Sequence, residues 1–332
     1  MQVPAAVSPL TRDIVMGPAR PARVLAVFPT AVYLAVDGGD HEGTARARTA
    51  LPGTALPGTV LPVVTADALL LPTALRLGLS SRDVRWSSAH GDEAVVGGGG
   101  VVAPGLDVRV AREWRPSRVR SGLTLPGEAA RELLGHEGVL AGLCADLTRA
   151  GLRGEPVDRQ VGGLVGAGVG LTPSGDDALC GVLLALRAWG PQRRGIEDGA
   201  ADARAEPAVS VAVASVVDAV ARNRHRTTSL SASLLTAAAA GFAVPQVSSL
   251  VEALSQSNSA AGRSLVVTAL EAVHGFGHSS GRDLVAGLAG ALHSIESTTS
   301  PIESTTSPIE STIPTIERAG PASPRPEGTT RG

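Results

Sequence analysis

Aromatic side chains are nearly absent from this 332-residue chain, and this scarcity constrains what its core can be. Only 2% of the residues are Phe, Trp or Tyr, whereas hydrophobic residues make up 43%. The core must therefore consist largely of Ala, Val and Leu, and closely packed helices must meet through small residues. Because only 18% of the residues are charged, we expect most of the chain to be globular.

The charged residues exclude several classes of protein. All 29 basic residues are Arg, which excludes a Schiff-base lysine, a pyridoxal-phosphate anchor, a Walker A lysine and a protein-kinase lysine. A GC-rich genome would explain the bias, although Arg also suits recognition of carboxylate or phosphate. The net charge of −2 and the few aromatic rings argue against nucleic acid as a partner.

The cysteines and the apolar segments indicate the cellular compartment of the protein. Cys144 and Cys180 lie in helical patterns with no zinc-ligand spacing, so we expect two buried, reduced thiols. No segment reaches the roughly 18 apolar residues of a membrane span, and the first residues lack a signal-peptide pattern. We therefore expect a cytoplasmic protein with no membrane partner.

The residue pattern divides the chain into three parts. We predict an α+β fold class: a small β-rich N-terminal domain (1–116), then a larger, mainly α-helical domain (117–294) with Gly-rich loops at helix starts. A small sheet or barrel suits the first part, and the four glycines at 97–100 suit a turn between two strands. The predicted strands are 24–28, 31–36, 58–64, 84–86, 94–96 and 106–110; the predicted helices are 127–150, 176–189, 208–222, 231–240, 247–254 and 283–292.

Two other segments are predicted to lack regular structure. Residues 193–206 are polar and charged, which favours an exposed loop. Residues 295–332 begin with a seven-residue repeat that carries one Ile and a recurrent Pro, which forbids a coiled coil. We predict a disordered, low-complexity tail without catalytic residues.

The first segment with chemical potential is a glycine run, residues 162–170, that leads through Thr-Pro into a helix start. Glycines allow a ligand to approach the backbone, and a helix start presents free N–H groups and a positive dipole end to an anion. Ser and Asp there also form a capping box, but a cap accounts for neither the glycines nor the second Asp. The candidates are Gly170, Thr172, Gly175, Ser174, Asp176 and Asp177, the last two also as ligands of Mg²⁺.

A second segment repeats the first at another helix start. Ser-Gly-x-Asp followed by Gly four residues later occurs at 174–181 and again at 280–287. An internal duplication would bring two similar helix starts to one cleft; chance recurrence in a sequence rich in Gly and Ser is the alternative. The candidates here are Gly277, Ser279, Ser280, Gly281 and Asp283.

A third segment combines arginines with hydroxyl side chains. The arginines at 222, 224 and 226, beside hydroxyl side chains, would form a clamp for phosphate or carboxylate, and the candidates are Arg226, Thr228 and Ser231. Alternatively, the arginines complement the C-terminal dipole of the preceding helix, and Ser229 or Ser231 caps the next one.

The string Gly-Leu-Thr-Pro-Ser-Gly-Asp-Asp at 170–177 resembles a family that includes the H subunit of oxamate carbamoyltransferase. The similarity extends through Thr228–Ser231 and 277–287 and covers about residues 20–293, although Arg115 stands where such proteins carry an acid. The resemblance implies a subunit of a carbamoyl-transferring assembly in ureide (allantoin) catabolism, which converts oxalurate and phosphate into oxamate and carbamoyl phosphate. It also implies other carbamoyltransferase subunits as partners.

The residues are compatible with that chemistry. Backbone N–H groups would stabilise the oxyanion of a carbamoyl transfer, and the substrate and phosphate are small anions. We predict catalytic roles for Ser174, Asp176 and Asp177, and substrate binding by the remaining candidates. No cofactor is required, with Mg²⁺ as the metal that the two aspartates would suit. The alternative is a non-catalytic subunit that binds an anionic metabolite or docks a catalytic partner.

Overall fold

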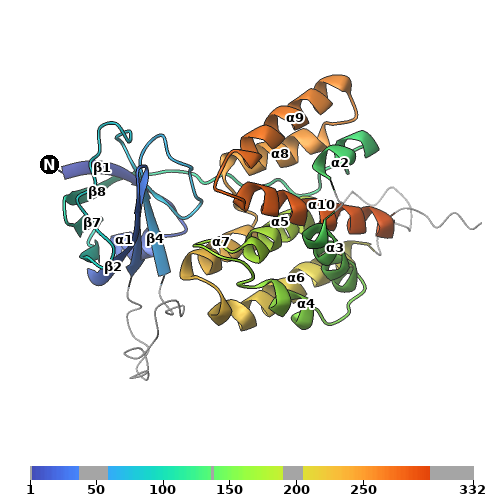
Figure 1. Cartoon of the computed structure of the whole chain (residues 1–332), viewed down its shortest axis with the longest axis horizontal. Helices are drawn as coiled ribbons and strands as arrows, with labels where there is room; N and C mark the ends of the chain where they lie inside the picture. Colours follow the sequence, from blue (N-terminus) through green and yellow to red (C-terminus); the bar gives the residue numbers. More distant parts are fainter. Residues whose placement is uncertain (1, 37–58, 136–137, 190–204, 300–332) are drawn as a thin grey trace, which may run out of the picture. The chain divides into compact units, whose positions relative to one another are not determined.

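The computed structural model describes residues 2–36, 59–135, 138–189 and 205–299 (Figure 1). Its first part is a closed barrel with the strand order β1-β5-β4-β3-β2-β6-β7-β8. The pairs β1–β8 and β4–β5 are parallel and the other neighbours are antiparallel. The elements are β1 (Gln2–Val7), α1 (Arg12–Met16), β2 (Arg20–Phe28), β3 (Ala31–Val36), β4 (Thr59–Val64), β5 (Leu75–Leu77), β6 (Glu93–Gly97), β7 (Gly100–Ala103) and β8 (Leu106–Glu113).

Strands β3 and β4 have buried residues on both faces, and this joins the barrel to the helices. Leu34 and Leu61 point into the barrel's own core, whereas Ala31, Val60 and Val64 belong to the larger core that the helices form. Strands with two buried faces read as continuous apolar runs, as β4 does. The barrel and the helices consequently share one compact unit, residues Met1–Ser300.

The second part consists of helices, drawn from green to red in Figure 1. Among the residues described, no helix is both long enough and apolar enough to cross a bilayer. The helices are α2 (Glu128–Leu134), α3 (Val139–Leu152), α4 (Asp158–Leu164), α5 (Ser174–Ala188), α6 (Ala205–Asn223), the short 3₁₀ helix η2 (Arg224–Arg226), α7 (Ser229–Ala239), α8 (Pro245–Ser255), α9 (Ala260–His274) and α10 (Ser280–Thr299).

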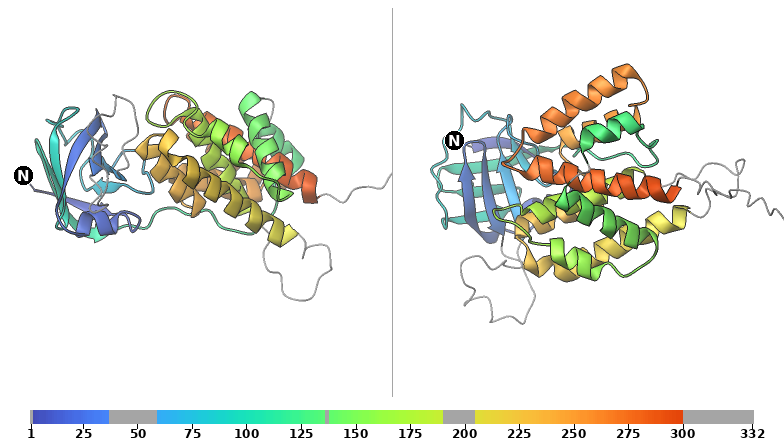
Figure 2. Two further views of the ribbon diagram at one scale, coloured as in Figure 1. Left: turned by 90° about the horizontal axis from the view of Figure 1, so that it is seen from below. Right: turned by 45° about the vertical axis from the view of Figure 1, so that its right-hand side comes forward.

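Helix α5 is the centre of the helical part. From Gly175 to Ala188 every residue except Arg187 is buried, as expected for a helix whose residues 178–186 are all apolar. Helix α10 lies alongside it in both views of Figure 2. The two backbones meet at two glycines: a Cβ on Gly181 would overlap the carbonyl oxygen of Leu284, and a Cβ on Gly287 would overlap that of Ala178. Small residues therefore supply the close packing that the lack of aromatic rings requires.

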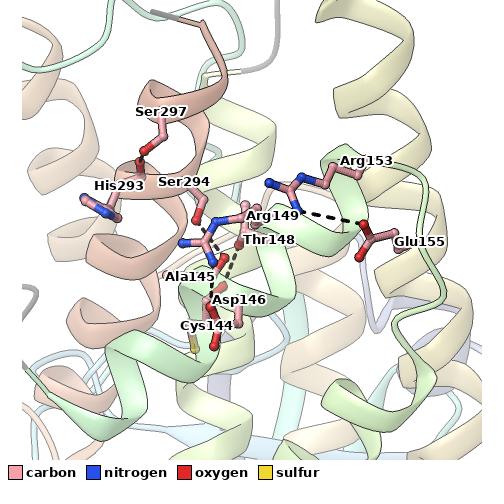
Figure 3. Close-up of polar contacts among 10 residues, drawn as sticks. All are labelled: Cys144, Ala145, Asp146, Thr148, Arg149, Arg153, Glu155, His293, Ser294 and Ser297. Atoms are coloured by element: carbon pink, nitrogen blue, oxygen red, sulfur yellow. Dashed lines mark hydrogen bonds and ion pairs between the residues drawn. The ribbon is translucent and has the colours of Figure 1, made fainter.

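Helix α10 also contacts α3 through a buried hydrogen bond (Figure 3). The Ser294 hydroxyl donates to the carbonyl oxygen of Ala145 over 2.7 Å, and Ser294 is fully buried. One turn along α3, Thr148 donates to the carbonyl oxygen of Cys144 over 2.8 Å. These bonds satisfy the hydroxyl groups that the helix interface buries.

The fold class predicted from the sequence is wrong. A β-rich N-terminal part is present, but its eight strands close into a barrel that shares a core with the helices. The predicted Gly-rich loops at helix starts are not confirmed. Closure depends on pairing β1 with β8, about 100 residues away in sequence, and local patterns do not report such a pairing. The predicted strand at 84–86 does not form, and the predicted helix at 127–150 is divided into α2 and α3.

Other predictions from the sequence have mixed outcomes. The turn at 97–100 is confirmed as the β6–β7 hairpin, with positive φ at Gly98 and Gly99 as a two-residue turn requires. Helices α1, α4 and α9 and strands β1, β5 and β7 were not predicted. The division of the chain at residues 116 and 294 stays a prediction. Most of the loop predicted at 193–206 and the tail from residue 300 lie outside the described residues, while α10 continues to Thr299.

We expect Gly287→Ala to lower the free energy of unfolding by about 1–3 kcal/mol, because the added methyl group pushes α10 away from α5. Urea denaturation followed by circular dichroism measures the change. The control is Gly142→Ala, at an exposed helical position with open space around it, which should raise the free energy by about 0.5–1 kcal/mol. Equal stability of Gly287→Ala and the native chain would contradict the proposed contact.

Candidate functional site

The two similar helix starts lie next to each other. Thr172, in the loop before α5, is hydrogen-bonded to Ser280, the first residue of α10, with 3.0 Å between their hydroxyl oxygens. Helix α5 follows α4 and helix α10 follows α9, each after a short loop. In both pairs, the glycine after the matched serine packs on a carbonyl oxygen near the end of the preceding helix: Gly175 on Leu164 and Gly281 on Val273. The repeat in the sequence is therefore also a repeat in the structure.

Both helix starts border one cavity of about 190 Å³. Its polar lining includes Thr172 and Asp177 from the first helix start and Ser280 from the second. Most of the remaining lining is apolar and comes from the barrel and four helices. The apolar members are Leu69, Leu71, Pro72, Leu184, Leu230, Leu234, Ala238, Phe242, Ala243, Val244, Val247, Phe276 and Leu284, and Tyr33 and Cys180 complete the lining with Gly277.

Asp177 is the charged residue of this lining, and it is 8% exposed. Its Oδ2 atom is buried and has no hydrogen-bond partner. Burial raises the pKa of Asp177 to about 7; the hydroxyls of Ser280 and Thr172 oppose this shift, and the charge of Asp283 adds to it. A carboxyl group with a pKa near neutrality can both donate and accept a proton at physiological pH.

Asp176 has a different environment, although it is the adjacent residue. Its Oδ1 atom accepts the backbone N–H of Gly166 over 3.0 Å, and its Oδ2 atom accepts the hydroxyl of Thr227. Burial is the main cause that raises the pKa of Asp176, and these hydrogen bonds oppose the shift. Asp176 thus ties the start of α5 to the α4–α5 loop and to the segment before α7, and it does not line the cavity.

Joint ligation of Mg²⁺ by the two aspartates stays a prediction. Both carboxylate oxygens of Asp176 already accept hydrogen bonds within the protein. Over the ranges that the structure describes, no group of three or more His, Cys, Asp or Glu side chains could hold a metal ion.

The remaining predicted site residues mostly shape the two loops. Thr228 caps α7: it accepts the N–H of Ser231 and donates to the carbonyl oxygen of Leu171 over 2.6 Å. The Ser231 hydroxyl lies 3.4 Å from the same carbonyl oxygen. The N–H of Gly175 donates to Ala167 over 2.8 Å, so this amide is already paired.

Ser174 is the first residue of α5, but Pro173 is the N-cap and no side chain caps the helix. A capping box therefore does not explain Asp177. Gly170 and Arg226 are exposed and do not line the cavity. Near α10, the Ser279 carbonyl accepts the N–H of Asp283, whose Oδ2 atom is buried without a partner.

Sequence reasoning missed the apolar wall of the site and the role of Thr227. The wall combines barrel residues such as Tyr33 and Leu71 with residues of α7 and α8, which are far apart in sequence. No local signal identifies it. Thr227 could have been found, because it neighbours the predicted Thr228 and pairs with the predicted Asp176.

We expect Asp176→Ala to lower the free energy of unfolding by about 1–3 kcal/mol, since the Gly166 N–H and the Thr227 hydroxyl lose their acceptor. Chemical denaturation measures the loss. The control Thr227→Ser keeps the hydroxyl and should cost less. If Asp176→Ala is as stable as the native chain, Asp176 does not hold these segments together.

Asp177 should make the protein less stable as the pH rises. Its pKa is about 7 in the folded state against an ordinary 3.8, so between these values the folded state binds a proton that the unfolded state has released. The free energy of unfolding therefore falls across this window, by up to about 4 kcal/mol. Denaturation at pH 4 to 8 should show that Asp177→Asn removes this part of the decline. A variant with an unchanged decline would contradict the assignment.

Comparison with known proteins shows that part of the chain is similar to a described family. Neither the curated proteins nor the solved structures contain a match to this chain. Residues 164–292, the segment from the end of α4 into α10 that holds both helix starts, match the family described as oxamate carbamoyltransferase subunit AllH. This match confirms for these residues the resemblance inferred from the sequence.

Proposed function

We propose that this chain is a subunit of a carbamoyl-transferring enzyme and that Asp177 binds the ureido group of its substrate, oxalurate. The observation that carries the proposal is the buried, unpartnered Oδ2 atom of Asp177 at a cavity that both helix starts border. This site lies in the segment similar to the oxamate carbamoyltransferase subunit family. The reaction would belong to ureide (allantoin) catabolism.

The polar lining of the cavity complements a carbamoyl group. The terminal amino group of a ureido group would donate to the Oδ2 atom of Asp177, and the hydroxyl of Thr172 or Ser280 would donate to its carbonyl oxygen. The N-terminal ends of α5 and α10 add the positive ends of two helix dipoles. These dipoles would stabilise negative charge that develops on the carbamoyl oxygen during transfer.

Asp177 would also move the proton that the reaction requires. Phosphate forms a bond to the carbamoyl carbon of oxalurate, and the bond from that carbon to the bridging nitrogen breaks. Protonated Asp177 donates its proton to the departing nitrogen, which gives oxamate, and the proton of hydrogen phosphate restores the acid. The products are carbamoyl phosphate and oxamate, so that atoms and charges balance. A pKa of about 7 suits this exchange.

Other candidate nucleophiles and anion-binding groups do not contribute inside the cavity. Burial and the nearby Asp177 and Asp176 raise the pKa of the Cys180 thiol well above its ordinary value, so it stays protonated. No arginine is among the described residues that line the cavity. We therefore propose that one oxygen of phosphate reaches the carbamoyl carbon, while the other phosphate oxygens and the oxalurate carboxylate lie outside the cavity, where exposed Arg side chains or partner subunits pair with them.

A non-catalytic binding subunit is the second candidate. The specific observation in its favour is that most of the cavity lining is apolar, which suits retention of a ligand more than polar chemistry. Its polar residues would then fix the orientation of a bound metabolite for a catalytic partner.

The test is phosphate-dependent formation of carbamoyl phosphate from oxalurate by the full chain, alone and with candidate partner subunits. We expect Asp177→Asn to reduce kcat about 100-fold or more and Ser280→Ala to reduce kcat/KM less strongly. Activity in this direction should fall above about pH 7, whereas the reverse reaction, which needs the Asp177 carboxylate as a base, should rise across the same range.

The matched control is Leu265→Asn, a substitution at a 54% exposed position of α9, which should retain native activity. Full activity of Asp177→Asn in a competent assembly would refute the catalytic role. Ligand binding by native chain that never supports turnover with any partner would favour the non-catalytic subunit.

A further inference from the structure

The cavity contains more apolar surface than a ureido group needs. Hydrogen bonds to Asp177, Thr172 and Ser280 account for the head of the ligand, but they do not account for the side chains around it. Leu184, Leu230, Leu234, Val247 and Leu284 line the cavity from α5, α7, α8 and α10. Leu69 and Leu71 line it from the barrel part.

The acidic charge of the lining disfavours a ligand whose substituent is anionic or polar. Asp177 is the one charged side chain among the described lining residues, and it is acidic. A carboxylate placed among the leucines would lose its hydration and meet no cation, which is costly. An uncharged apolar substituent would instead gain contacts with the wall.

The size of the cavity limits the ligand further. A volume of about 190 Å³ is below the roughly 300–1,000 Å³ typical of pockets for drug-sized ligands. A nucleotide or a large cofactor would not fit within this volume. A ureido group that carries a short alkyl chain or a small ring is of the appropriate size.

We propose that the cavity binds small N-substituted ureas whose ureido head contacts Asp177 and whose substituent is uncharged and apolar. This inference rests on the proposed function only in assigning the ureido group to Asp177. It adds a substrate class, since the hydrocarbon of these ligands contacts the wall of the cavity, whereas the carboxylate of oxalurate would lie outside it. The buried, unpartnered Oδ2 atom supplies the acceptor, and the wall of the cavity supplies the selectivity.

Isothermal titration calorimetry on the full chain tests the proposal with four probes: urea, n-butylurea, n-pentanoate and n-butylamine. We expect n-butylurea to bind at least about tenfold more tightly than urea, because each buried methylene contributes about fourfold. Asp177→Asn should weaken n-butylurea binding by about tenfold. Leu234→Asn, which places an amide on the wall at a half-buried position, should weaken n-butylurea but not urea. The control Leu265→Asn should change neither.

Each outcome decides for or against the inference. Equal binding of urea and n-butylurea would overturn it, as would binding of n-pentanoate or n-butylamine as tight as that of n-butylurea. If Asp177→Asn does not fold, the contrast between Leu234→Asn and Leu265→Asn still tests the apolar wall. Turnover of oxalurate is measured separately, so failure of n-butylurea to bind leaves the proposed carbamoyl transfer standing, and loss of turnover leaves this binding result intact.

Discussion

The close contact of α5 and α10 is the constraint on which the rest of the site depends. Gly181 and Gly287 let the two backbones approach until the carbonyl oxygens of Leu284 and Ala178 occupy the space of the missing side chains. Because the glycines occupy matching positions, the helices meet with their starts on the same side, and Thr172 comes within hydrogen-bond distance of Ser280. A chain with so few aromatic rings reaches native packing density in this way, and the same packing forms the polar lining of the cavity.

Asp176 and Asp177 show how hydrogen-bond partners, rather than burial alone, separate structural from chemical roles. Both are buried at the first turn of α5, and burial raises the pKa of both. Both carboxylate oxygens of Asp176 accept hydrogen bonds, from Gly166 and Thr227, so Asp176 fixes the loops that surround the site. One carboxylate oxygen of Asp177 has no hydrogen-bond partner and lies beside an apolar cavity. The charge of Asp283, from the other helix start, also raises the pKa of Asp177. An unpartnered buried oxygen is costly unless a ligand pairs with it, which makes Asp177 the residue to test first.

The sequence predicted the local parts of this arrangement and failed on the non-local ones. The repeated Ser-Gly-x-Asp pattern indicated two similar helix starts, and the structure brings Thr172 and Ser280 together. The same pattern could not distinguish Asp176 from Asp177, because their roles depend on Thr227 and Ser280, residues from other segments. The closed barrel could not be predicted from local patterns, because it depends on the pairing of β1 with β8 and β5. The wall residues Tyr33 and Leu71 reach the cavity only once the barrel has closed. Periodicity reports which face of a strand is buried, but not which strand it pairs with.

The distribution of charge indicates how the chemistry would be divided between subunits. Carbamoyl transfer to phosphate combines a neutral ureido group with ions that carry several negative charges. The cavity suits the first and not the second, since its one charged lining residue in the described part of the chain is an acid. Phosphate recognition generally requires Arg or Lys forks or unpaired backbone N–H groups, and the N–H of Gly175 is already paired with Ala167. The proposed site would hold the carbamoyl group and its proton in this mostly apolar cavity and take the phosphate-binding charges from an adjoining surface.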